Sequence, residues 1–191
     1  MKTIITFIFT LVTVVTFAQK DFQGKATYMS KTTMDMGHFG GSGAKIDQFN
    51  CCHGITLDTR DSSKPTLLIT SRASQEFKRF SLDGKHIETI SLPGCSICRP
   101  VIHGNNMYFA VIVTKTWDSW DGMLAVLDSD NKVISLPGGS EPEYTNGKLT
   151  PPVFDGKTFR NPHDVLVDND ENLYVPQWAS GKTYPVKLNR I

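Results

Sequence analysis

The sequence has almost no charge imbalance and, after its first residues, no long hydrophobic run. Its 20 lysines and arginines nearly cancel its 19 aspartates and glutamates, which leaves a formal net charge of +1. Because charges of both signs are interspersed, the chain lacks the basic stripe of a nucleic-acid-binding surface. It also lacks a Gly-x-Ser-x-Gly motif, which would place a nucleophilic serine. We therefore expect no nucleic-acid binding, no spanning of a membrane by a later segment, and no serine hydrolase chemistry.

The first 18 residues have the parts of a secretory signal peptide. Lys2 supplies a short positive start, residues 4–17 are apolar with interspersed threonines, and Ala18 ends a small-residue cleavage site. The run is shorter than the roughly 20 residues that a membrane-spanning helix needs. We expect cleavage after Ala18 and a secreted or periplasmic protein that begins at Gln19.

The chain has only four cysteines, at positions 51, 52, 95 and 98. In an oxidising compartment an even number of cysteines predicts disulfides. Cys51 and Cys52 precede the first strand of one repeat, and Cys95 and Cys98 precede that of the next. We therefore expect a bridge between the two pairs, and the sequence does not choose the partners. Zinc binding by the same thiols is the less favoured interpretation.

A repeat of 44 to 45 residues is present in the rest of the chain. Ser-Leu-Pro-Gly occurs at 91–94 and again at 135–138, and Leu82-Asp83 is matched by Leu127-Asp128. Repeats of this length in short strand-like runs are typical of β-propeller blades. A blade cannot bury its apolar face alone, so neighbouring blades are needed.

Apolar alternation and turn residues predict the strands of three units. The predicted strands are 53–58, 66–71, 76–82 and 86–92, then 99–103, 107–113, 123–127 and 132–136, then 165–167, 173–177 and 183–188. Residues 138–160 contain turns but no clear strand. The predicted fold is all-β: a partial β-propeller of about three four-stranded blades over residues 49–191, the last blade incomplete. Residues 19–48 are expected to be a leader or linker with one strand near 26–29.

Three residues occupy equivalent places before the first strands of the units. His53, Arg99 and His163 each lie five positions upstream of a turn residue. First strands border the channel of a propeller, so these side chains are expected to converge there. Two imidazoles and a guanidinium can bind a metal, a carboxylate or a phosphate. The alternative is that both histidines hydrogen-bond neighbouring strands at the inner rim.

Two segments resemble the starts of NHL repeats, which build six-bladed propellers. Residues 49–58 read Phe-Asn-Cys-Cys-His-Gly-Ile-Thr-Leu-Asp, and residues 161–175 begin Asn-Pro-His-Asp and end Asn-Leu-Tyr-Val. They are similar to the Pro-His-Gly-type opening, the aspartate and the second strand of that repeat. The resemblance covers residues 49–191 and departs in the second unit, where Arg99-Pro100 takes the place of a histidine.

The resemblance implies a metal site. A relative within this family, the peptidyl-α-hydroxyglycine amidating lyase, holds an axial zinc through histidines from several blades. His53 and His163 correspond in motif position to such ligands, whereas Arg99 cannot coordinate a metal and would instead steer an anionic substrate. Calcium is a further cofactor considered, at the acidic turn 168–171, although that turn lacks the EF-hand glycine and terminal glutamate.

Two other features bear on partners. Residues 19–37 are similar to the mature N-terminus of GLPGLI-type secreted proteins, on the segment Asp-Phe-Gln-Gly-Lys-Ala-Thr-Tyr at 21–28. Trp117, Trp120 and Trp178 lie in predicted loops or at a strand end, where tryptophans stack on sugars or peptides. The alternative is that they fill the gaps between blades.

Three functional hypotheses remain. The first is a secreted module, not an enzyme, that binds a small-molecule, sugar or protein ligand. The second is a metal-dependent, lyase-like enzyme centred on His53 and His163. The third is a truncated or fused propeller without independent activity. Since three blades leave two open faces, a homodimer that completes a six-bladed ring is an expected partner arrangement.

Overall fold

The computed structural model describes residues 39–191, apart from 115, 117, 118, 120, 180 and 183. The chain divides into two units, Met1–Gly37 and His38–Ile191, and only the second contains described residues. The predicted signal peptide, the strand near 26–29 and the segment 21–28 lie outside the described residues. So do Trp117 and Trp120.

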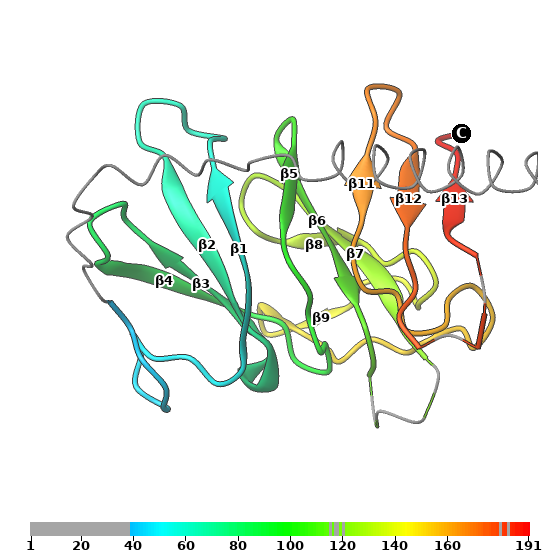
Figure 1. Ribbon diagram of the computed structural model, residues 1–191, viewed down its shortest axis with the longest axis horizontal. Helices are drawn as coiled ribbons and strands as arrows, with labels where there is room; N and C mark the ends of the chain where they lie inside the picture. Colours follow the sequence, from blue (N-terminus) through cyan, green and yellow to red (C-terminus); the bar gives the residue numbers. More distant parts are fainter. Residues whose placement is uncertain (1–38, 115, 117–118, 120, 180, 183) are drawn as a thin grey trace, which may run out of the picture. The chain divides into compact units, whose positions relative to one another are not determined.

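The described residues form four small antiparallel sheets and no α-helix, so the all-β prediction is confirmed. No sheet among these residues closes on itself (Figure 1). The first sheet has the order β1 (Cys52–Asp58), β2 (Thr66–Ser71), β3 (Glu76–Phe80) and β4 (His86–Ser91), with a 3-10 turn η1 (Arg72–Ser74) after β2. The second has the order β5 (Val101–His103), β6 (Asn106–Val111), β7 (Met123–Leu127) and β8 (Val133–Ser135).

The third sheet has three described strands, and a short hairpin precedes it. The sheet comprises β11 (Leu166–Val167), β12 (Leu173–Val175) and β13 (Val186–Leu188). The hairpin pairs β9 (Tyr144–Thr145) with β10 (Lys148–Leu149), inside the segment that was predicted to hold no strand. Its turn is Asn146-Gly147, and both residues have positive φ. Asn-Gly is a dipeptide strongly favoured in two-residue hairpin turns, so the sequence itself contained a signal for this hairpin.

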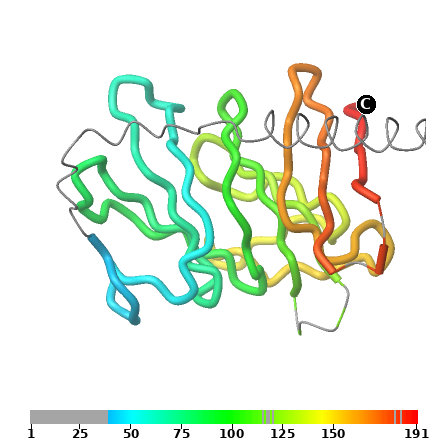
Figure 2. The backbone as a smooth tube through the Cα atoms, in the orientation of Figure 1, coloured from blue at the N-terminus to red at the C-terminus, as the bar shows by residue number. Residues whose placement is uncertain are grey.

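Two hydrophobic cores join the three larger sheets, and β6 contributes to both. Met107, Phe109 and Val111 belong to the core shared with the first sheet, where the rings of Phe77 and Phe109 meet edge to face at 4.9 Å. Tyr108 and Ala110 belong to the core shared with the third sheet. Alternate side chains of a strand point to opposite faces. The continuous apolar run of β6 therefore places the second sheet between the other two (Figure 2).

Residues 39–49 pack on the first sheet, although residues up to 48 were predicted to be linker. Phe39 and Phe49 lie 5.2 and 5.5 Å from the ring of Phe80. The buried ammonium of Lys78 donates hydrogen bonds to the carbonyl oxygens of Lys45 and Ile46. This segment covers part of the outer face of the sheet. Ile55 and Leu57 on β1 stay about half exposed, at 53% and 48%.

A buried ionic cluster ties the first sheet to the β7–β8 turn of the second. Asp58 accepts hydrogen bonds from Arg60 and Arg79 at 2.7 and 2.6 Å. Arg60 also donates to the carbonyl of Asp128 and to Oδ1 of Asn131. Burial alone would raise the pKa of Asp58, but the hydrogen bonds from the two arginines outweigh it and hold that pKa at about 2. The cluster thus stays ionised and fixes the angle between two sheets.

Candidate functional site

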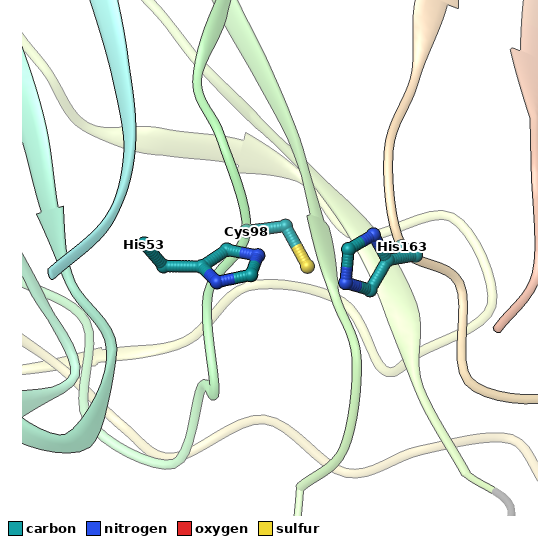
Figure 3. A group of neighbouring side chains, drawn as sticks. All are labelled: His53, Cys98 and His163. Carbon is teal, nitrogen blue, oxygen red and sulfur yellow. The ribbon is translucent and has the colours of Figure 1, made fainter. Parts of the chain in front are cut away.

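Two histidines and one cysteine meet where the three larger sheets come together. The donor atoms of His53, Cys98 and His163 all lie within 4.8 Å of one another. The two imidazole centroids are 5.2 Å apart with their planes at 84°. Figure 3 shows the sulfur of Cys98 between the two rings. His53 is in β1, Cys98 lies just before β5, and His163 lies just before β11, so each sheet supplies one donor.

The local backbone explains how β1 presents His53. Its ladder with β2 has a register irregularity between Cys52 and Ile55, and such irregularities re-aim side chains. Gly54 permits the close approach of the next sheet, because a Cβ at this position would lie 2.8 Å from the Cα of Arg99. His53 therefore reaches toward the second and third sheets, while Ile55 remains exposed on the outer face.

The other two donors are held by backbone hydrogen bonds. The Cys98 amide donates to the carbonyl of Ala110 at 2.8 Å, and the hydroxyl of Thr70 donates to the Cys98 carbonyl at 2.9 Å. The His163 amide donates to the carbonyl of Pro176 at 2.9 Å. Cys98 is thus anchored to both the first and the second sheet, and His163 to the third.

Arg72 is the charged neighbour of the cysteine. It begins η1 and is buried, with 7% of its surface exposed. Its Nε donates to the carbonyl of Ile97 at 2.9 Å, and its Nη2 donates to Sγ of Cys98 at 3.1 Å. Sequence reasoning missed this residue, because Arg72 stands outside the repeat register and only the folded chain brings it to the thiol.

The electrostatics of the site favour neutral imidazoles. Burial is the largest cause that lowers the pKa of both His53 and His163, and the charge of Arg72 lowers both further, against an opposing effect of Asp164. Burial raises the pKa of the Cys98 thiol to about 11, although Arg72 opposes the rise. The cluster therefore offers two imidazole lone pairs and a thiol, whose proton a metal ion would displace on binding.

The donor set fits a transition-metal ion. Tetrahedral coordination with bonds of about 2.0 Å to nitrogen and about 2.3 Å to sulfur separates two nitrogens by roughly 3.3 Å and a nitrogen from the sulfur by roughly 3.5 Å. The donors of His53, Cys98 and His163 lie within 4.8 Å of one another, so they would have to move closer to reach these values. Three protein ligands leave a position open for an external molecule. His53 also lines a cavity of about 670 Å³ beside the first sheet, together with Phe49 and Cys52.

Arg99 was predicted to converge with the two histidines, but the residue that joins them is Cys98. Neighbouring residues in extended chain point to opposite sides. Arg99 instead donates two hydrogen bonds to the carboxylate of Asp164, at 3.0 and 3.1 Å, as a partly exposed ion pair. The sequence held a signal for this: Leu82 and Leu127 are 45 positions apart, and the same offset from His53 falls on Cys98.

The structure contains no disulfide pair between the predicted partners, because all four cysteines are free thiols. Cys51 and Cys52 are exposed, whereas Cys95 and Cys98 are buried in different surroundings. Cys95 belongs to the core between the first two sheets, where burial raises its pKa to about 12. Cys98 faces the histidines instead of the Cys51/Cys52 pair. The two cysteine pairs precede the first strands of neighbouring units, but this placement does not join the sulfurs of one pair to those of the other.

Two further predicted positions lie outside the cluster. Trp178 is half exposed, and its amide donates to the carbonyl of Asn161 at 2.9 Å. The Asp168 carboxylate, considered for calcium, accepts hydrogen bonds from the amides of Asp170 and Asn172 and from the hydroxyl of Tyr174. These contacts are those of a turn in which the aspartate side chain accepts hydrogen bonds from the backbone amides that follow it.

No protein-family model matches the sequence, and comparison with curated proteins likewise gives no match. Across the part of the chain that the structure describes, there is no helix of the length and apolarity required to cross a bilayer.

Proposed function

We propose that this chain binds a transition-metal ion through His53, Cys98 and His163. The observation that carries the proposal is that three separate sheets each deliver one metal-binding donor to the same place. The cluster is made of two imidazoles and a buried thiol rather than of exposed acidic groups, which are common without an ion. Burial and the charge of Arg72 lower the pKa of both imidazoles, which favours the neutral, metal-binding form.

We further propose that residues 49–191 are an NHL-like propeller segment in a secreted or periplasmic protein. Three observations support this assignment: the 45-residue repeat, the two four-stranded antiparallel sheets, and a second sheet packed on both faces. In a propeller the first strand of each blade borders the axis. A metal held by residues at or just before β1, β5 and β11 would then be axial.

The proposed role of the metal is to hold an external ligand. Three protein ligands leave a coordination position open, and the exposure of His53 gives access to it. The chain would then act as a binding module whose ligand completes the coordination. A lyase-like reaction is the second candidate, favoured by the Arg99–Asp164 pair next to Cys98 and His163, where Arg99 would orient an anionic substrate.

Metal analysis of the mature chain tests the proposal. We expect one equivalent of ion per chain, with thiolate-to-metal charge transfer when Co²⁺ is the probe. Loss of any one of the three protein ligands should weaken metal binding by about 100-fold or more. The variants that test this are His53→Ala, His163→Ala and Cys98→Ser. His103→Ala is the matched control. His103 lies in β5, outside the cluster, and its ring meets the ring of Tyr108 edge to face. A chain that binds no ion, or binds it equally in all three variants, refutes the assignment.

A homodimer is the proposed partner arrangement. A second copy seated on the outer face of the first sheet would bury Ile55 and Leu57, which residues 39–49 leave half exposed. Light scattering on the mature chain decides this point. A monodisperse monomer at all concentrations rules out a paired ring.

A further inference from the structure

We propose that the ion selected by this site is monovalent copper, and that Arg72 sets the preference. The inference rests on the proposed metal site and goes beyond it by assigning the ion and its charge. It follows from the donor types, the charge beside them and the positions of the donors.

The donor types favour a soft ion. Thiolate selects Cu(I) and zinc among the available metals, and imidazole suits both zinc and copper. No carboxylate belongs to the cluster among the described residues. Asp164, next to His163, is held by Arg99 and by the amide of Val165. The site therefore offers none of the hard oxygen ligands that magnesium, calcium or manganese prefer.

The charge beside the sulfur disfavours a divalent ion. Arg72 is buried, its Nη2 is 3.1 Å from Sγ of Cys98, and no described ion pair joins it to a carboxylate. Buried charge requires compensation. A Cys98 thiolate supplies one negative charge. With Cu(I) the thiolate, the ion and Arg72 sum to +1, whereas with Zn²⁺ they sum to +2. The charge of Asp164 also acts on the donors, but Asp164 is paired with Arg99, so that pair adds no net charge to either sum.

The donor set is that of copper sites with two histidines and one cysteine. Such sites are trigonal and add a weak, long axial contact, which a backbone oxygen can supply. The carbonyl oxygen of Pro162 lies 4.0 Å from Sγ of Cys98. Three donors from three sheets therefore supply the two imidazoles and one thiolate of such a copper site, and the remaining position stays open for an external ligand.

Competition experiments on the mature chain test the inference. Cu(I) affinity is measured without oxygen against a chromogenic Cu(I) chelator, and Zn²⁺ affinity against a zinc chelator. We expect Cu(I) to bind at least about 100-fold more tightly than Zn²⁺. X-ray absorption of the Cu(I) form should show one sulfur and two nitrogen neighbours.

Variants at two positions isolate the causes. Arg72→Gln removes the charge and should shift the affinity ratio toward Zn²⁺ by roughly 10- to 100-fold. Arg72→Lys keeps the charge and should keep the preference. Cys98→His replaces the soft donor and should also shift the ratio toward Zn²⁺. Arg190→Gln is the matched control, because that arginine pairs with Glu171 at the surface and is not part of the cluster, and it should leave the ratio unchanged.

The outcomes separate this inference from the metal site itself. If Zn²⁺ binds as tightly as Cu(I) through the same three residues, the copper assignment falls and the metal site stands. If neither ion binds, both fall. Circular dichroism shows whether Arg72→Gln folds. If it does not, two results still decide the question: the ratio of Cu(I) to Zn²⁺ affinity in Cys98→His, and the sulfur neighbour in the X-ray absorption of the wild type. An unchanged ratio in Cys98→His overturns the inference.

Discussion

Gly54 lies so close to Arg99 that a Cβ on the glycine would sit 2.8 Å from the Cα of the arginine. This approach brings β1 against the start of the second sheet, and Thr56 reinforces it by donating a hydrogen bond to the carbonyl of Pro100. Gly54 follows His53, and Arg99 follows Cys98. The closeness of these two backbones therefore sets the separation of two of the three donors.

Gly54→Ala should separate the first two sheets at the site. We expect a loss of about 1–3 kcal/mol in the free energy of unfolding, because the added methyl group meets backbone atoms that cannot yield. Metal affinity should fall with it. Denaturant unfolding and a metal titration measure the two effects. The control is Gly104→Asn, at a glycine with positive φ and open space, where asparagine is tolerated. Equal stability of Gly54→Ala and the wild type would contradict the close approach.

Phe109→Ala should test whether the second sheet packs on its neighbour. The ring is fully buried against Phe77, so its removal leaves a cavity and should cost about 3–5 kcal/mol. Ile134→Ala in β8 is the matched control, since that side chain is half exposed, and it should cost well under 1 kcal/mol. Urea unfolding measures the free energy of unfolding of both variants. Similar losses of this free energy in the two would be inconsistent with the described core.

Asp58 should couple stability to acidic pH. Its folded pKa of about 2 lies below the ordinary value of 3.8. The unfolded chain therefore binds the proton more readily. The stabilisation is fully present above the ordinary value and is lost as the pH falls toward about 2. Asp58→Asn should cost about 3 kcal/mol at neutral pH, because the partly buried Arg60 loses its carboxylate partner and Arg79 keeps only Glu88.

Unfolding measured from pH 6 to pH 2 checks this prediction. Asp61→Asn is the control, since Asp61 is exposed and bonds only its own turn. The difference between the wild type and Asp58→Asn should shrink as the pH falls. A difference that stays constant over this range would mean that the cluster does not act through the charge of Asp58.

Thiol labelling should distinguish the two pairs of cysteines. Cys51 and Cys52 are exposed, while Cys95 and Cys98 are buried and their pKa values are raised by burial to about 12 and about 11. The thiolate is the reactive form, so iodoacetamide should modify two thiols in the native protein and four after unfolding. Intact-mass measurement counts the labels. Two labels in the unfolded, unreduced protein would reveal a disulfide and contradict the free thiols.

Local patterns determined the strands but not the partners of their side chains. Periodicity placed β2 and β7 at their observed bounds, because alternation between two faces depends on neighbouring residues alone. It also aligned His53 with His163 through the repeat. The same alignment of the units selected Arg99 instead of Cys98, one position away. The units were aligned on the turn residue Gly104, whereas the 45-residue offset of the repeat leads from His53 to Cys98.

By itself, the sequence determined an all-β chain of repeated antiparallel units and placed two histidines at equivalent positions, because hydrophobic period and turn chemistry are local properties. Only the tertiary structure decided that Cys98 joins these histidines, that Arg72 lies against its sulfur, and that the four thiols stay apart. These contacts arise from the angle and spacing at which separate sheets pack, and packing depends on side chains from the whole core.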